Sequence, residues 1–199
     1  MMRLFIAISV PERVKDEIER AQTELRNALA RDRVRWVGRA QFHLTLKFLG
    51  EVDPLRLEAL TLALRPACEG IGALRLGAAG VFVIPELRRP RLIWVAVEEM
   101  QHRLAPLHRA VEAAAAQFTS EEAEPAFKGH ITLARCKAIA RPRIDLLATL
   151  AKAMVERRFG EWTAETIEVV RSELGPGGSR YTTLAAIPLA APCDSSDAS

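Results

Sequence analysis

The sequence has few cysteines, no strong excess of charge of either sign and no long apolar run. Cys68, Cys136 and Cys193 are its three cysteines, and they are far apart. This spacing fits neither a disulfide framework nor a Cys-x-x-Cys metal site, so we expect a reducing, cytoplasmic setting. The apolar start of the chain lacks the basic region and cleavage site of a signal peptide, and no segment predicts a membrane span. We therefore expect no membrane among its partners.

The residues that are present have the composition of a globular protein. Of 199 residues, 49% are hydrophobic, which is enough for a packed core. Lys and Arg number 28 against 25 Asp and Glu, for a net charge of +3. This excess is compatible with an anionic substrate, but it does not by itself establish nucleic-acid binding.

One short motif occurs twice, as His43-Leu44-Thr45-Leu46 and as His130-Ile131-Thr132-Leu133. Each copy lies in a segment that alternates polar and apolar residues, which predicts a half-buried strand. In a strand, residues i and i+2 share a face, so each histidine points the same way as its threonine. Each strand would thus present an imidazole and a hydroxyl together.

The rest of the pattern predicts an α+β fold. Strands next to each other in sequence, without βαβ units, favour antiparallel sheets. If each half of the chain formed one sheet, and the two sheets faced each other, the motifs would meet across a cleft. The predicted strands are Arg3–Val10, Val34–Val37 paired with Phe42–Leu49, Leu74–Val83, Arg91–Val97, Phe127–Cys136, Thr163–Glu173 and Arg180–Ala186. The predicted helices begin at Pro11, Pro54, Met100 and Pro142, and residues 175–178 predict a turn.

Paired histidines suit the cleavage of a phosphodiester. One group must take a proton from the attacking oxygen and another must give one to the leaving oxygen, and a pKa near ~6.5 lets one imidazole be neutral while its partner is protonated. Thr45 and Thr132 would each donate a hydrogen bond to a non-bridging phosphate oxygen. A single His-x-Thr would more simply be a surface strand pattern. Two copies favour a site.

The other histidines and the nearby basic residues are less informative. His102 and His108 are six residues apart on one predicted helix, about 120° around its axis, so they do not form an i, i+4 metal pair. No acid or cysteine stands at metal-ligand spacing, and we expect no metal and no cofactor.

Strand parity makes predictions for three basic residues beside the motifs. It places Lys47 on the face of His43 and Lys128 on the face of His130, where each could attract phosphate or simply be solvated. Arg135 has the opposite parity and is predicted to point away, into a structural ion pair, unless a bulge turns it.

With His43–Gly50 and His130–Arg135 in view, the chain closely resembles the two-histidine phosphoesterase superfamily. Within it, the chain is most similar to the bacterial and archaeal RNA 2′,3′-cyclic phosphodiesterases, also called 2′-5′ RNA ligases. The likeness includes Arg3–Ile8, Trp36-Val37, Pro90–Val95 and Ser172–Tyr181, and so extends over nearly the whole chain. One departure is Lys128-Gly129, where the family often has Arg-Pro.

The resemblance implies a bilobal α+β domain over residues 1–191, with pseudo-two-fold symmetry and a central cleft, followed by a flexible tail over 192–199. It also implies a monomer that hydrolyses the terminal 2′,3′-cyclic phosphate of RNA, without metal, to a 2′-phosphomonoester. His43 would be the proton donor, His130 the proton acceptor, and Thr45 and Thr132 would bind the substrate. The reverse reaction, 2′-5′ ligation, uses the same histidines and stays open. A non-catalytic RNA- or nucleotide-binding module is a further alternative, which the intact motifs disfavour.

Overall fold

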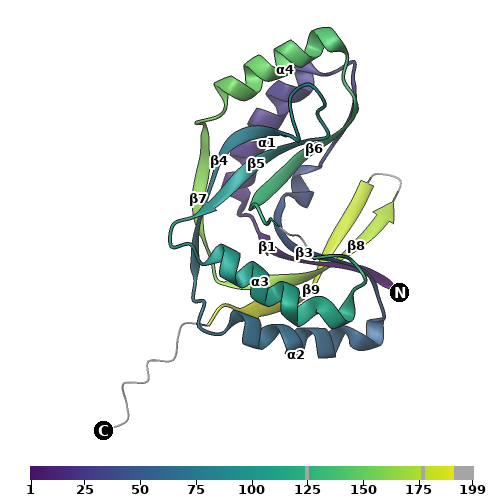
Figure 1. Cartoon of the computed structure of the whole chain (residues 1–199), viewed down its shortest axis with the longest axis vertical. Coiled ribbons are helices and arrows are strands. Elements are labelled where there is room, and N and C mark those ends of the chain that lie inside the picture. The colour runs from purple at the N-terminus through teal and green to yellow at the C-terminus, as the bar shows by residue number, and fades with distance from the viewer. Residues whose placement is uncertain (124–125, 176–177, 191–199) are drawn as a thin grey trace.

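The computed structural model describes residues 1–123, 126–175 and 178–190, which form two lobes (Figure 1). The predicted tail over 192–199, Cys193 and the centre of the predicted turn, residues 176–177, lie outside the described residues. The helices are α1 (Glu12–Ala28), α2 (Leu57–Cys68), α3 (Leu104–Ala115) and α4 (Arg141–Ala153), with short 3-10 helices at Arg39–Gln41, Pro54–Arg56 and Ala116–Phe118. The strands are β1 (Met2–Ser9), β2 (Arg33–Trp36), β3 (His43–Val52), β4 (Leu74–Ile84), β5 (Leu92–Glu99), β6 (His130–Ala138), β7 (Arg158–Ala164), β8 (Thr166–Gly175) and β9 (Gly178–Pro188).

The strands form two antiparallel sheets, as an α+β fold requires. The motif-1 sheet, which carries His43, has the order β3-β1-β8-β9, and the motif-2 sheet, which carries His130, has the order β2-β6-β5-β4-β7. All their pairings are antiparallel. The prediction of an α+β fold with antiparallel sheets is therefore confirmed.

The prediction that each half of the chain forms its own sheet is wrong. Strands β2, β4 and β5 of the first half lie in the motif-2 sheet, whereas β8 and β9 of the second half lie in the motif-1 sheet. The order β1-α1-β3-α2-β4 is repeated as β5-α3-β6-α4-β8, with β2 inserted before β3 in the first copy and β7 before β8 in the second. In each copy the last strand crosses to the other sheet and pairs with the first strand of the other copy, β4 with β5 and β8 with β1. The two copies are thus interlocked through exchanged strands.

Two further strand predictions need correction for the same reason. Strands β2 and β3 do not pair with each other, since β2 pairs with β6 and β3 with β1. The single strand predicted over Thr163–Glu173 is divided at Glu165 into β7 and β8, which lie in different sheets. Alternation of polar and apolar residues locates a strand but does not choose its partner.

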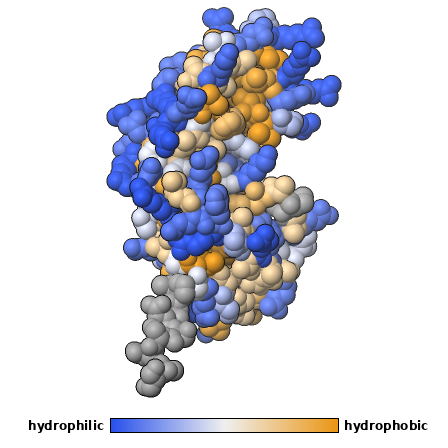
Figure 2. Space-filling model, turned by 60° about the vertical axis from the view of Figure 1, so that its left-hand side comes forward, coloured by the Kyte–Doolittle hydropathy of each residue, from blue (hydrophilic) through white to orange (hydrophobic). Residues whose placement is uncertain are grey.

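The helices cover the outer faces of the sheets. Helices α1 and α4 pack together on the motif-2 sheet, and α2 and α3 pack together on the motif-1 sheet (Figure 1). One contiguous cluster of buried apolar residues extends through both lobes, from Leu4 on β1 to Leu189 after β9. The face shown in Figure 2 has many hydrophilic side chains, an apolar area on the upper lobe and paler apolar areas on the lower lobe. Within the described ranges, no helix is both long and apolar enough to cross a membrane.

Candidate active site

The two motif strands approach each other between the lobes. Strands β3 and β6 are in contact although they belong to different sheets. His43 and Thr45 from β3, and Thr132 from β6, line one cleft of about 430 Å³. His130 is the first residue of β6, two positions before Thr132, and its charge contributes to lowering the pKa of His43. The structure therefore brings three of the residues predicted from the motifs to one cleft and places the fourth, His130, near His43.

A β-bulge follows the threonine in both motifs. Leu46 is the extra residue on β3, opposite the step from Ile6 to Ala7, and Leu133 is the extra residue on β6, opposite the step from Ile93 to Trp94. An extra residue reverses the parity of the strand beyond it. The bulges therefore stand at the same place in the two copies and change which side chains face the cleft.

Lys47 does not share the face of His43 and Thr45, so that prediction is wrong. Beyond the Leu46 bulge it pairs with Ile6 and points into the core. Its side chain is 4% exposed, and Nζ lies 2.8 Å from Oε2 of Glu112. Lys128 precedes β6 and is exposed, and it is not among the described residues that line the cleft. Parity along β6 therefore does not apply to Lys128.

Arg135 does face the cleft, contrary to the prediction for a regular strand. The Leu133 bulge brings it to the face of Thr132, where it lines the cavity. The equivalent position in the first motif is Phe48, which lines the same cavity. The prediction for Arg135 assumed a regular strand, and the bulge at Leu133 makes β6 irregular at this point.

Both histidine rings are held by the same contact. Nδ1 of His43 lies 2.5 Å from the carbonyl oxygen of Gln41, and Nδ1 of His130 lies 2.7 Å from that of Lys128. A carbonyl can only accept, so Nδ1 donates in each ring and carries a hydrogen. Nε2 is then the nitrogen that can gain or lose a proton. The two motifs thus fix the same tautomer by the same local geometry.

Aromatic side chains from neighbouring strands pack against these rings. The His43 ring lies 4.7 Å from that of Phe5 and 5.2 Å from that of Tyr181, between ring centroids, and His130 lies 4.0 Å from Trp94. Burial is the main cause that lowers the pKa of His43 to about 4, so its imidazole is neutral at pH 7 in the free protein. Sequence reasoning did not single out these aromatic residues as site residues.

The threonine hydroxyls have the position expected of ligand donors. Thr45 and Thr132 line the cavity, and no residue in the described part of the chain hydrogen-bonds to either hydroxyl. A threonine in mid-strand has no helix to cap, so its hydroxyl remains available to a ligand. Both motifs thus pair an imidazole with an available donor.

Three arginines give the cleft a positive wall, and none of them was predicted to face it in a regular strand. Arg3 comes from β1, Arg35 from β2 and Arg135 from β6, and all three line the cavity. Burial raises the pKa of the Tyr181 phenol, and the positive charges of Arg135, Arg3 and Arg35 partly oppose this. The three guanidinium groups therefore act on one phenol from two sheets. Alternation along β1 and β2 would have predicted that Arg3 and Arg35 face the cleft only if the partners of these two strands had been known.

The remaining histidines lie away from these motifs. His108 is buried on α3, with its ring stacked 4.1 Å from that of Phe127 and Nε2 3.4 Å from Oε1 of Glu112. His102 is exposed, in a turn before α3. Among the described residues, no group of three His, Cys, Asp or Glu side chains could hold a metal ion.

Comparison with known proteins identifies the family. The family model described as LigT like Phosphoesterase matches residues 8–94 and 95–181. The boundary between the two matches lies within β5, close to the start of the second copy of the strand and helix order. A cleft with two histidine and threonine pairs on repeated strands is that of a two-histidine phosphoesterase, an enzyme. The chain belongs to the family of LigT-like phosphoesterases.

Individual relatives agree with this assignment. The RNA 2′,3′-cyclic phosphodiesterase of Thermus thermophilus is 38% identical over 194 residues, covering 92% of this chain and 88% of that protein. That of Methanothermobacter thermautotrophicus is 29% identical over 185 residues, covering 92% and 96%. A crystal structure from Thermus thermophilus matches with a TM-score of 0.74 at 30% identity over 96% of this chain and 99% of that one. The fold of Escherichia coli LigT, crystallised with 3′-AMP, matches with a TM-score of 0.73 at 24% identity, covering 94% and 98%.

Proposed function

We propose that this enzyme hydrolyses the 2′,3′-cyclic phosphate at an RNA end to a 2′-phosphomonoester, without a metal ion. The observation that carries the proposal is the pair of imidazoles, each held through Nδ1 by a backbone carbonyl and each beside a cleft-facing threonine. The substrate class comes from the names of relatives up to 38% identical. The large apolar cluster that extends through both lobes from Leu4 to Leu189 supports a further part of the proposal, that residues 1–191 act as one catalytic domain. We also propose that this domain acts as a monomer.

In the proposed reaction the histidines have opposite roles. Nε2 of His130 accepts a proton from the water that attacks phosphorus, while Nε2 of His43 donates one to the 3′ oxygen as the bond from phosphorus to that oxygen breaks. Thr45 and Thr132 donate hydrogen bonds to the non-bridging oxygens, on which charge develops. Arg135, which the bulge brings beside Thr132, adds a charge-assisted contact to the same phosphate.

The donor role of His43 requires its pKa to rise when substrate binds. Free His43 has a pKa of about 4, because burial disfavours the imidazolium. An anionic phosphate in the cleft would favour the charged form and raise that value. We expect NMR titration to give a midpoint near pH 4 for His43 in the free protein, and a midpoint at least one unit higher with saturating phosphate or nucleoside 2′-monophosphate. A midpoint that stays near 4 would mean that His43 is not the donor.

The proposed function is tested with an oligoribonucleotide that ends in a 2′,3′-cyclic phosphate, incubated with the pure protein in EDTA. We expect hydrolysis, with the phosphate on the 2′ oxygen, as determined by phosphorus NMR of the product. A 3′-phosphate would show that the other ester bond breaks. Loss of activity in EDTA, restored by a divalent cation, would indicate a metal-activated water instead. A second oligonucleotide with a free 5′-hydroxyl in the same assay reveals any ligation.

Valine substitution tests the proposed role of the threonines. Thr45→Val and Thr132→Val keep the β-branched shape and remove only the hydroxyl donor. Loss of a hydrogen bond to a charged group costs roughly 1.5–3 kcal/mol, so kcat/KM should fall by about one to two powers of ten. The melting temperature should change little, because no described residue bonds to either hydroxyl. Thr61→Val is a matched control, since the Thr61 hydroxyl bonds to Leu57 on α2, outside the cleft. Early unfolding with full activity of the folded fraction would make the motif threonines structural.

A further inference from the structure

Two arginines lie directly opposite each other on the cleft side of the motif-2 sheet. Arg35 on β2 is the register partner of Arg135 on β6. Side chains that face each other across two strands are about 5 Å apart at Cβ, and like charges in such a pair are destabilising. No carboxylate of the described residues lies within ion-pair distance of either arginine. By contrast, Arg39 nearby in sequence is paired with Glu12, Asp16 and Glu19.

The opposite sheet adds a third positive charge to the same cleft. Arg3 on β1 lines the cavity, is exposed, and likewise has no ion pair within the described residues. The charges of Arg135, Arg3 and Arg35 all act on the pKa of Tyr181, which agrees with a position of the three arginines in one part of the cleft. One acid, Glu121, lines the cavity with them. The cleft thus holds an excess of cations that its own residues do not neutralise.

One terminal phosphate does not account for three arginines. A cyclic phosphodiester carries a single negative charge, which Arg135 already matches from its place beside Thr132. Arg35 is on the edge strand β2, one strand beyond Arg135, and so about 5 Å further across the sheet. The surplus charge therefore extends from the motif residues toward the β2 edge of the motif-2 sheet.

We propose that Arg35 and Arg3 form a second phosphate subsite, which binds the phosphodiester of the nucleotide that precedes the cyclic end. This inference rests on the proposed function and specifies its substrate as an oligonucleotide end instead of a cyclic mononucleotide. The bound phosphodiester neutralises the repulsion between Arg35 and Arg135. The subsite reads the RNA backbone and not the bases, since guanidinium groups bind phosphate oxygens without regard to sequence.

The test compares two substrates that differ by one nucleotide, namely 2′,3′-cyclic AMP and the dinucleotide ApA ending in a 2′,3′-cyclic phosphate. We expect the wild-type protein to favour the dinucleotide in kcat/KM, and Arg35→Gln and Arg3→Gln each to reduce that preference by about tenfold. The salt dependence of the dinucleotide reaction should also weaken by ~0.7 in the log–log slope for each arginine that no longer binds a phosphate. Direct binding of the two 2′-phosphate products, measured by calorimetry, should show the same difference.

Arg158→Gln is the matched control. Arg158 is exposed on β7, the opposite edge strand of the motif-2 sheet, and is outside the cavity. Its variant should retain the wild-type preference. Equal turnover of both substrates by the wild-type protein, or an equal loss on both in Arg35→Gln, would overturn the subsite while leaving the proposed function intact. Absence of turnover with either substrate would instead overturn the proposed function, and the subsite with it.

Discussion

Replacement of either motif histidine by alanine should lower kcat by ~10²–10⁴-fold, the range for loss of one general acid or base. His43 and His130 each supply one of two proton transfers, and the cleft presents each with Nδ1 already bonded to a carbonyl. The measurement is single-turnover hydrolysis of a cyclic-phosphate oligonucleotide, with thermal unfolding to confirm the fold. Because both groups act in one transition state, the double variant should lose much less than the product of the two single losses.

His102 provides the control for these variants. It is exposed and has a φ of 57°, a backbone conformation that asparagine tolerates. His102→Asn should therefore keep both wild-type turnover and stability. If His43→Ala or His130→Ala also retained near-wild-type turnover, the two-histidine mechanism would be wrong for this chain.

The sequence predicted the faces of the motif side chains correctly only as far as the fourth motif residue. Alternation along His43–Leu46 and His130–Leu133 indicated which side chains point to the core, and Leu44 and Ile131 are indeed fully buried. Beyond the fourth motif residue the same reasoning placed Lys47 and Arg135 on the wrong faces. A bulge leaves no mark in the sequence when, as here, its extra residue is a leucine and not a glycine. Only the pairing with β1 and β5 reveals it.

The remaining site residues could not be predicted because distant strands supply them. Phe5 and Trp94 reach the histidines from β1 and β5, and Tyr181 arrives from β9. In β1 the cleft-facing Phe5 stands between buried Leu4 and Ile6, so no polar and apolar alternation distinguishes the two faces. Which strands pair, and in which sheet, depends on contacts between residues far apart in the sequence. The local pattern of polar and apolar residues predicts only that a strand exists.

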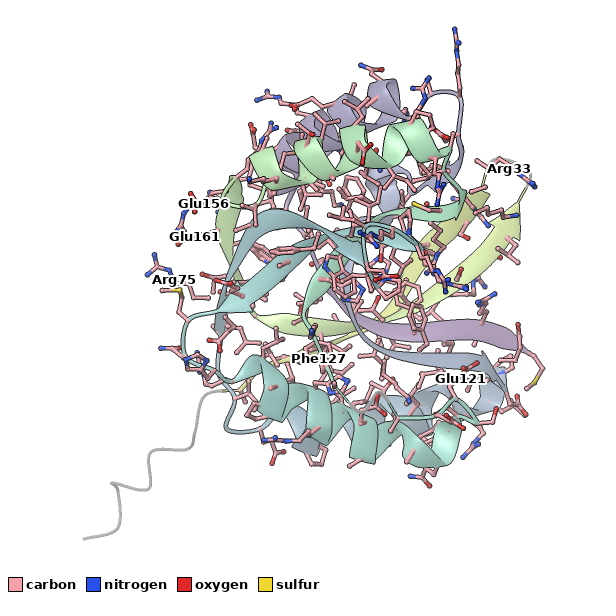
Figure 3. All side chains as sticks on the ribbon, turned by 45° about the horizontal axis from the view of Figure 1, so that its top comes forward. Arg33, Arg75, Glu121, Phe127, Glu156 and Glu161 are labelled. Carbon is pink, nitrogen blue, oxygen red and sulfur yellow. The ribbon has the colours of Figure 1, made fainter. Side chains whose placement is uncertain are left out.

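The side chain that the first bulge turns inward links the two motifs. Nζ of Lys47 lies 2.8 Å from Oε2 of Glu112 on α3 and donates a 2.8 Å hydrogen bond to the carbonyl oxygen of Glu122. Glu122 belongs to the segment that leads from α3 to His130, and Figure 3 shows Glu121 and Phe127 of this segment alongside α3. Phe127 in turn stacks on His108, which contacts Glu112. Lys47 therefore connects the strand of the first motif, β3, to the segment that precedes His130.

Removal of the Lys47 charge should cost about 3 kcal/mol of unfolding free energy, near the lower end of the range for breaking a buried ion pair. Lys47→Met removes the ammonium group beside the carboxylate of Glu112, which is only 13% exposed. Urea denaturation at pH 7 measures the loss. In the folded fraction kcat should fall more than KM rises, because the segment before His130 is no longer held by the Lys47 ammonium while the phosphate-binding side chains keep their positions.

Two comparisons separate the ion pair from a simple packing effect. Arg20→Met removes an exposed pair with Glu17, whose side chains are 68% and 42% exposed, and should cost under about 1 kcal/mol. Adding Glu112→Leu to Lys47→Met replaces both charges by apolar side chains and should restore much of the lost stability, because no buried charge is then left unpaired. Restored stability together with a persistently low kcat would show that the pair positions the His130 segment in addition to stabilising the fold. If Lys47→Met alone lowered the free energy of unfolding by less than about 1 kcal/mol, solvent would reach Glu112 and the contact between Lys47 and Glu112 would contribute little to stability.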